Sequence, residues 1–238
     1  ESFSFQQFID LFKNKPWIIL TLTGICTNFF NGFRYAVAGY MLEYCLGGHL
    51  TWVSLTIDYM TFMAFGEVTC MLFGGVSPAF TKWAGSKRRA FMWSAVICFV
   101  TSVIFFFIPM QPSYIWLMIV MCVLTSVGIG LFSPLLWSMY ADVADYATET
   151  FGASSTGLIF SSGTMSQKFG SAISGSLIAL FIGMAGAQMI PDSVGNLVLD
   201  PASVGESFYT MVWSLFSIFP AVIALIMCFL VYIFPLKK

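Results

Sequence analysis

The stretch LFSPLLWSMYADVADYATETFGASSTGLIFSSGTMSQKFGSAISGSLI, residues 131–178, joins the end of one apolar segment to the start of another. Between the two we predict an acidic turn that carries Asp142, Asp145 and Glu149. Lys168 then lies inside the second apolar segment, about 18 Å along a helix that begins at Thr156. This distance places the ammonium group near the middle of a membrane whose apolar core is about 30 Å thick.

A lysine at that depth costs at least about 2.5 kcal/mol on insertion scales, so we expect the protein interior to hold it. Its neighbours on the same helical face are small or polar: Ser161, Thr164, Ser171 and Gly175. We therefore predict that Lys168, Thr164 and Ser171 line a substrate or cation pathway. The alternative is a structural lysine, for which Lys168→Val would be tolerated or stabilising.

The composition places the chain in a membrane. Of its 238 residues, 58% are hydrophobic and only 9% are charged, and the mean hydropathy is +0.87. A soluble core of this size cannot bury so much apolar surface. The net charge of -1 argues against a nucleic-acid partner.

The apolar pattern predicts an all-α membrane protein with six transmembrane helices in one bundle, residues 17–238. A short amphipathic segment, residues 1–16, precedes it as an interfacial helix or an ordinary linker. We expect the helices to form two three-helix repeats of inverted topology. The predicted spans are 17–46, 55–78, 91–108, 114–137, 156–185 and 208–234, the last interrupted by Pro220.

The basic residues predict the orientation. Lys13, Lys15, the cluster from Lys82 to Arg89 and the terminal lysines alternate with loops that contain no Lys or Arg. By the positive-inside rule both termini are cytoplasmic, in the cell (inner) membrane. The chain begins at Glu1 without an initiator methionine, so we expect that a first part is missing.

Two further charges lie within the first two spans. Asn31 and Arg34 share a helical face in the first span, and Glu67 lies at a similar depth in the second. Arg34 either lines a cavity or forms a structural ion pair. Glu67 either pairs with Arg34 or is protonated and hydrogen-bonded to hydroxyl or backbone groups, because burial disfavours a charged carboxylate.

Glycines in the fourth and fifth predicted spans could bend a helix or allow helices to pack closely. Gly128, Gly130 and Pro134 could form a hinge in the fourth span, or they could allow close packing. In the fifth span, Gly170 with Ser174 and Ser171 with Gly175 follow the small-x-x-x-small spacing of touching membrane helices. From this spacing we predict that the fifth helix is central.

Other chemistry has little support. The single histidine, His49, lies in a predicted external loop, so neither a histidine-based metal site nor a Ser-His-Asp triad can form in the membrane. The six cysteines lie in or beside apolar segments without a C-x-x-C pair, which favours free thiols. We predict no enzyme, no cofactor and no metal site.

The run ADVADY (141–146), followed by TGLIFS (156–161) and QKFG (167–170), resembles the second half of the glycoside-pentoside-hexuronide:cation symporters, the melibiose-permease-like branch of the major facilitator superfamily. The family usually continues Asp-Tyr with Gly-Glu and basic residues, and Ala147 and Thr148 depart from this. The resemblance implies that Asp142, Asp145 and Tyr146 form a cytoplasmic gate or contact. Because of the departure, the family's usual cytoplasmic ionic contacts are not expected to be complete here.

The resemblance implies the C-terminal half of a secondary transporter that moves glycosides or other sugars with sodium, lithium or protons by alternating access. It also implies partners: a missing N-terminal six-helix half, or self-association, besides membrane lipid. Trp137 and Tyr140 could stack on a sugar but more often anchor an interface. The alternatives are a non-transporting scaffold or channel module, whose charges only join helices, and a lysolipid carrier of the same fold.

Overall fold

The computed structural model describes residues 5–48, 50–52, 54–151, 156–191 and 197–236. His49 and the terminal lysines, which carry predictions made above, lie outside these ranges. The described helices are α1 (Phe5–Lys13), α2 (Lys15–Tyr40), α3 (Tyr59–Ala84), α4 (Lys87–Phe106), α5 (Ile115–Phe151), α6 (Thr156–Met184), α7 (Glu206–Phe216) and α8 (Ile218–Tyr232). The short elements are η1 (Met41–Cys45), β1 (Leu50–Trp52), β2 (Leu55–Ile57), η2 (Pro112–Tyr114), β3 (Met189–Pro191), β4 (Leu197–Leu199) and η3 (Pro201–Ser203).

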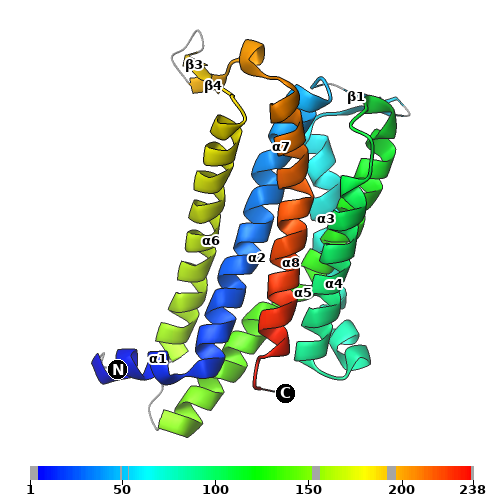
Figure 1. Cartoon of the computed structure of the whole chain (residues 1–238). Coiled ribbons are helices and arrows are strands. Elements are labelled where there is room, and N and C mark those ends of the chain that lie inside the picture. Colours follow the sequence, from blue (N-terminus) through cyan, green and yellow to red (C-terminus); the bar gives the residue numbers. More distant parts are fainter. Residues whose placement is uncertain (1–4, 49, 53, 152–155, 192–196, 237–238) are drawn as a thin grey trace.

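The long helices run side by side in one elongated bundle (Figure 1). Both termini, α1 and the connection between α3 and α4 lie at one end, which we call the basic end because Lys13, Lys15 and the 82–89 cluster lie there. The antiparallel hairpins β1–β2 and β3–β4 lie at the opposite end. The chain therefore crosses from end to end in alternating directions, as the spacing of basic residues predicts.

The set of contacting helix pairs is symmetric: it stays the same when the first three long helices are exchanged with the last three. The most extensive contacts are α2 with α6, α3 with α5, α4 with α5, α4 with α8, and α2 with α8. Exchanging α2 with α5, α3 with α6 and α4 with α8 reproduces this set of pairs. Each exchange joins helices that run in opposite directions (Figure 1), which is the relationship between inverted repeats.

The predicted acidic turn is wrong. Asp142, Asp145 and Glu149 all lie on α5, which continues without a break from Ile115 through Phe151 instead of ending near residue 137. At 37 residues the helix is about 55 Å long, much longer than an apolar core of about 30 Å. Its acidic last part therefore projects beyond the other helices at the basic end (Figure 1).

Other boundaries also differ from the predicted spans. The second span does not start as a helix at residue 55, because residues 55–57 form β2 and Asp58 then caps α3 through a 2.8 Å bond from the Thr61 amide. The helix continues past Pro78 to Ala84, where Gly85 ends it at a φ of 81°. The interruption predicted at Pro220 occurs at Ser217, between α7 and α8.

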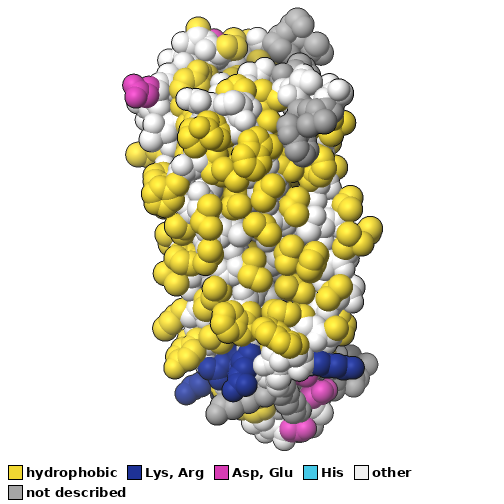
Figure 2. All heavy atoms as spheres, turned by 90° about the vertical axis from the view of Figure 1, so that its right-hand side faces the viewer, with side chains coloured by type: hydrophobic (Ala, Val, Ile, Leu, Met, Phe, Trp, Pro, Cys, Tyr) yellow, Lys and Arg dark blue, Asp and Glu magenta, His cyan; other side chains and the backbone are white. Residues whose placement is uncertain are grey.

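The surface matches a lipid environment. Figure 2 shows hydrophobic side chains over the middle of one face, with Lys and Arg gathered below them at the basic end. Among the described residues, four helical segments have the length and hydropathy to cross a membrane: Tyr59–Ala84, Lys87–Phe106, Pro112–Phe151 and Glu206–Tyr232. The long helices α2 and α6 fall outside this set, and they are the helices that carry Arg34 and Lys168.

Glycines in α5 allow close packing against neighbouring helices. A Cβ at Gly128 would lie 2.6 Å from Cys98 Sγ, and one at Gly130 would lie 2.5 Å from the Cys70 carbonyl oxygen. These contacts bring α4 and α3 against one continuous helix. The close-packing interpretation therefore accounts for both residues.

Candidate functional site

Arg34 lies in the interior of the bundle. Its side chain is only 5% exposed, and Nη2 donates a hydrogen bond to Cys122 Sγ at 3.3 Å. The guanidinium carbon lies 6.0 Å from the centre of the Phe30 ring and 5.9 Å from that of Phe216. Aromatic faces attract a cation but do not neutralise it. The ion pairs among the described residues, Lys13–Asp10 and Lys87–Asp142, do not include Arg34.

A small cavity lies beside this arginine, with a volume of about 10 Å³, room for about one water molecule. Asn31 Oδ1, on the cavity wall, is buried and accepts no hydrogen bond from any described residue. A water molecule in the cavity could donate a hydrogen bond to this oxygen, because buried polar groups without a protein partner are commonly satisfied by water. The lining residues are Asn31, Arg34, Tyr35, Met63, Glu67, Cys70, Ser126 and Ile129.

Glu67 reaches the same cavity but does not pair with Arg34. Its Oε1 accepts a hydrogen bond from the Tyr35 hydroxyl, and its side chain is exposed at the surface of α3. Tyr59 in turn donates to the Tyr35 carbonyl oxygen at 3.2 Å. Of the two alternatives for Glu67, the structure therefore shows the hydrogen bond to a hydroxyl group. The described residues form no direct Arg34–Glu67 ion pair.

Lys168 lies on an exposed stripe of α6 together with Ser161, Thr164, Ser171 and Gly175. A second exposed stripe on the same helix is apolar: Met165, Phe169, Ile173, Leu180 and Met184. Consecutive residues of a helix are about 100° apart, so the two stripes face different directions. The apolar stripe suits lipid, whereas the polar stripe does not.

The structure corrects two expectations about α6. The helix is not central in this chain: it packs mainly on α2 and lies at the edge of the bundle (Figure 1). The interior of the chain also does not hold Lys168, which has an exposed side chain. Of the two small-residue pairs, Gly170 and Ser174 contact α2, whereas Ser171 and Gly175 lie on the exposed side.

The predicted pathway residues thus form two groups. Gly170, two residues after Lys168, touches α2 between Ile25 and Phe29. Arg34 therefore lies about two helical turns further from the basic end than Lys168 does. Asn31, Arg34 and Glu67 meet at the cavity, while Thr164, Lys168 and Ser171 share the exposed stripe.

The acidic segment makes one strong contact at the basic end. Lys87 Nζ lies 2.7 Å and 2.8 Å from the two Asp142 carboxylate oxygens, and this pair joins the start of α4 to the last part of α5. Asp145 is exposed and Tyr146 is half-buried, each beside Asp142 on the helix. This chain therefore contains an ionic contact at the basic end, although Ala147 and Thr148 depart from the family pattern.

The aromatic candidates have structural contacts. Tyr140 is 1% exposed and donates to the Leu20 carbonyl oxygen at 3.3 Å, so it is neither an interface anchor nor open to a sugar. Trp137 stacks on Phe160, with ring centres 6.2 Å apart. Sequence reasoning missed Tyr35, which lines the cavity, and Cys122, which accepts the hydrogen bond from Arg34. Their position beside Glu67 and Arg34 follows only from how α2, α3 and α5 pack.

The six cysteines are unpaired thiols distributed over different helices. Within the described part of the chain, no group of three or more His, Cys, Asp and Glu side chains could hold a metal ion.

The protein family described as "MFS/sugar transport protein" matches residues 3–238. The inner membrane symporter YicJ of Escherichia coli (strain K12) is 27% identical over 218 residues, which is 90% of this chain and 44% of the relative. The "Putative sulfoquinovose importer" of Salmonella typhimurium is 22% identical over 187 residues, 76% of this chain and 36% of the relative. The chain thus spans less than half the length of these relatives. No solved structure matches it.

Proposed function

Since the chain belongs to the MFS/sugar transport protein family, whose matched relatives are transporters and not enzymes, we propose that it forms the C-terminal six-helix half of a cation-coupled sugar symporter. The substrate class is glycosides or other sugars, and the coupling ion is sodium, lithium or a proton. Both termini face the cytoplasm. This placement is supported by the basic residues at one end of the bundle (Figure 2).

The observation that carries the proposal is the polar stripe of α6. Lipid solvates an ammonium group poorly, at a cost of at least about 2.5 kcal/mol. Lys168 and its neighbours therefore need a wet or polar surface opposite them, and the part of this chain that the structure describes does not supply one. A partner bundle that lines a water-filled pathway supplies it, as alternating access between two bundles requires.

The inverted pairing of helices supports the same proposal. Each half of a major facilitator contains inverted repeats, and the contacts of α2, α3 and α4 with α5, α6 and α8 are symmetric under that exchange. Arg34 and the unpaired Asn31 oxygen then lie in the wall of one half, able to bind a hydroxyl group of a sugar or a water molecule. In a scaffold whose charges only join helices, Arg34 would be expected to have a carboxylate partner.

Lys168 has a specific role in this proposal. Its charge requires carboxylates of the N-terminal half, the same acids that would bind the coupling cation, so lysine and cation compete for them. Arginine would not replace it, because a planar guanidinium fills the space differently. The chain by itself, lacking these acids, does not transport.

The test uses the full-length protein that contains this chain, reconstituted in liposomes and offered a panel of glycosides with and without a sodium or proton gradient. We expect gradient-driven accumulation of at least one glycoside, and loss of accumulation in Lys168→Val at normal folded yield. Met165→Leu, on the apolar stripe one turn away, is the matched control and keeps accumulation. Normal accumulation in Lys168→Val would end the proposed role of the lysine.

Two outcomes would favour the alternatives. A folded full-length protein that accumulates no glycoside but moves lysolipid between leaflets would be a lysolipid carrier. A protein in which cysteines placed at Thr164 and Ser171 stay closed to a membrane-impermeant reagent, on a background without native cysteines, would have a dry interface typical of a scaffold. Uptake by the isolated chain as a monomer would contradict the need for a partner half.

A further inference from the structure

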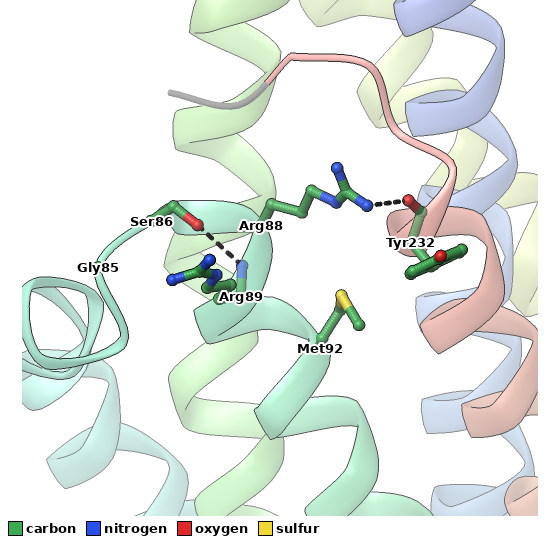
Figure 3. A pocket seen from close by; sticks show the side chains of 6 residues that line it. All are labelled: Gly85, Ser86, Arg88, Arg89, Met92 and Tyr232. Atoms are coloured by element: carbon green, nitrogen blue, oxygen red, sulfur yellow. Dashed lines mark hydrogen bonds between the residues drawn. The ribbon is translucent and has the colours of Figure 1, made fainter.

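A cleft lies at the basic end, between the start of α4 and the end of α8 (Figure 3). Its volume is about 510 Å³, and a second hollow of about 500 Å³ adjoins it through two shared residues, Met92 and Tyr232. The first hollow is lined by Gly85, Ser86, Arg88, Arg89, Met92 and Tyr232. The second is lined by Met92, Leu225, Ile226, Cys228, Phe229 and Tyr232.

The first hollow is cationic. Of the three consecutive basic residues that begin α4, Lys87 is neutralised by Asp142, whereas the ion pairs among the described residues include neither Arg88 nor Arg89. Arg88 donates one bond to the Tyr232 carbonyl oxygen and lies over the Tyr232 ring at 5.4 Å. Figure 3 shows both arginines beside the cleft. Their remaining N–H groups can bind an anion, and the forked guanidinium fits phosphate oxygens in two-point contacts.

The second hollow is apolar and lies on the outer side of the bundle. Leu225 is 55% exposed and Phe229 is 61% exposed, both on the surface of α8. These side chains form a hydrophobic groove that begins where the cationic hollow ends. A ligand that fits both parts therefore has an anionic phosphate at one end and a hydrocarbon chain at the other.

We propose that this cleft binds one anionic phospholipid, with its phosphate on Arg88 and Arg89 and an acyl chain along Met92, Leu225 and Phe229. The arrangement matches the membrane, because the charged part lies at the basic end and the groove extends toward the apolar middle of the bundle. Basic pockets between membrane helices bind anionic headgroups in this way. The bound lipid would join α4 to α8 beside the contact that Arg88 already makes.

The test titrates the purified chain in detergent micelles with phosphatidylglycerol and with phosphatidylcholine of the same acyl chains, and counts bound lipids by native mass spectrometry. A basic residue at a membrane surface contributes about 1 kcal/mol toward an anionic lipid, which is about fivefold in affinity. We therefore expect phosphatidylglycerol to bind more tightly, with about fivefold loss in Arg89→Gln and about 25-fold loss in the double Arg88→Gln, Arg89→Gln variant.

Lys82→Gln is the matched control, because Lys82 is an exposed basic residue in the last turn of α3 that does not line the cleft. It should leave the affinity unchanged. Phe229→Ser should weaken both lipids about tenfold, because it removes apolar wall from the groove. Thermal unfolding of each variant shows whether it folds, and Arg89→Gln decides the result if the double variant does not.

Three results would overturn the proposal. Equal affinity for phosphatidylglycerol and phosphatidylcholine would show that charge does not select the lipid. Equal effects of Arg89→Gln and Lys82→Gln would place the binding elsewhere. Displacement of phosphatidylglycerol by glycerol 3-phosphate at the same concentration would identify a site for a soluble phosphate rather than a lipid.

Discussion

Replacing Gly170 by alanine tests whether α6 is held against α2 at a distance that only glycine allows. A Cβ at this position would lie 2.5 Å from the Ile25 carbonyl oxygen, 2.8 Å from Asn28 Cβ and 3.0 Å from the Phe29 amide nitrogen. Two of these atoms are backbone, so no side-chain rotation relieves the overlap. Carbon contacts settle at about 3.5–4.0 Å, and α6 must therefore move away by roughly 1 Å.

The magnitude follows from two opposing effects. Overpacking of this kind costs about 1–3 kcal/mol, while alanine in a helix is about 0.5–1 kcal/mol more favourable than glycine. Gly175→Ala on the same helix is the matched control, since a Cβ there meets nothing within 4 Å. The preference of a helix for alanine over glycine contributes equally to Gly170→Ala and Gly175→Ala. The difference between the two free energies of unfolding therefore reports the packing cost, about 1–3 kcal/mol.

The assay is unfolding of the chain in dodecyl maltoside micelles by sodium dodecyl sulfate, followed by circular dichroism. We expect Gly175→Ala to be as stable as the parent chain or more so, and Gly170→Ala to be less stable. Equal stability of the two alanine variants would refute the close α2–α6 contact. It would also remove the basis for the position assigned to Lys168, which depends on that contact.

Three further predictions concern polar contacts. Lys87→Gln and Asp142→Asn should show a coupling energy of about 1–2 kcal/mol in a double-mutant cycle. This value lies between those of surface and of buried ion pairs, because the two side chains are 27% and 15% exposed. Additive effects would contradict the pair. Arg34→Met should retain folded yield, since none of the described carboxylates loses a partner. It should lower sugar uptake by the full-length protein at least about tenfold, whereas Tyr35→Phe should have a smaller effect. Unchanged uptake in Arg34→Met would exclude a pathway role. Tyr140→Phe should cost about 1 kcal/mol in unfolding measurements by deleting the buried bond to Leu20, and no change would place that hydroxyl in contact with water instead.

Part of the candidate site followed from the sequence. Arg34 and Asn31 share a face because helical spacing fixes it, and the polar stripe around Lys168 follows from the same periodicity. Helical spacing does not specify which neighbour a face meets. Tyr35 was therefore not identified as the partner of Glu67, and Lys168 was placed inside the chain although its stripe is exposed.

The sequence by itself determined the class of protein, because its apolar content and sparse charge exclude a soluble core. It also determined that the basic clusters share one end, and the motif in residues 141–170 identified a family that the match over residues 3–238 confirms. These properties depend only on composition and on the order of residues along the chain, and the sequence gives both directly.

Only the tertiary structure decided how each residue is used. Asp142, Asp145 and Glu149 have turn-like composition, yet α5 continues through them, with Lys87 of α4 neutralising the first. Gly170 and Gly175 are equivalent in sequence, but one touches the α2 backbone and the other faces open space. In a membrane protein both lipid-facing and interior surfaces are apolar, so hydropathy cannot distinguish them. Only the packing of helices can.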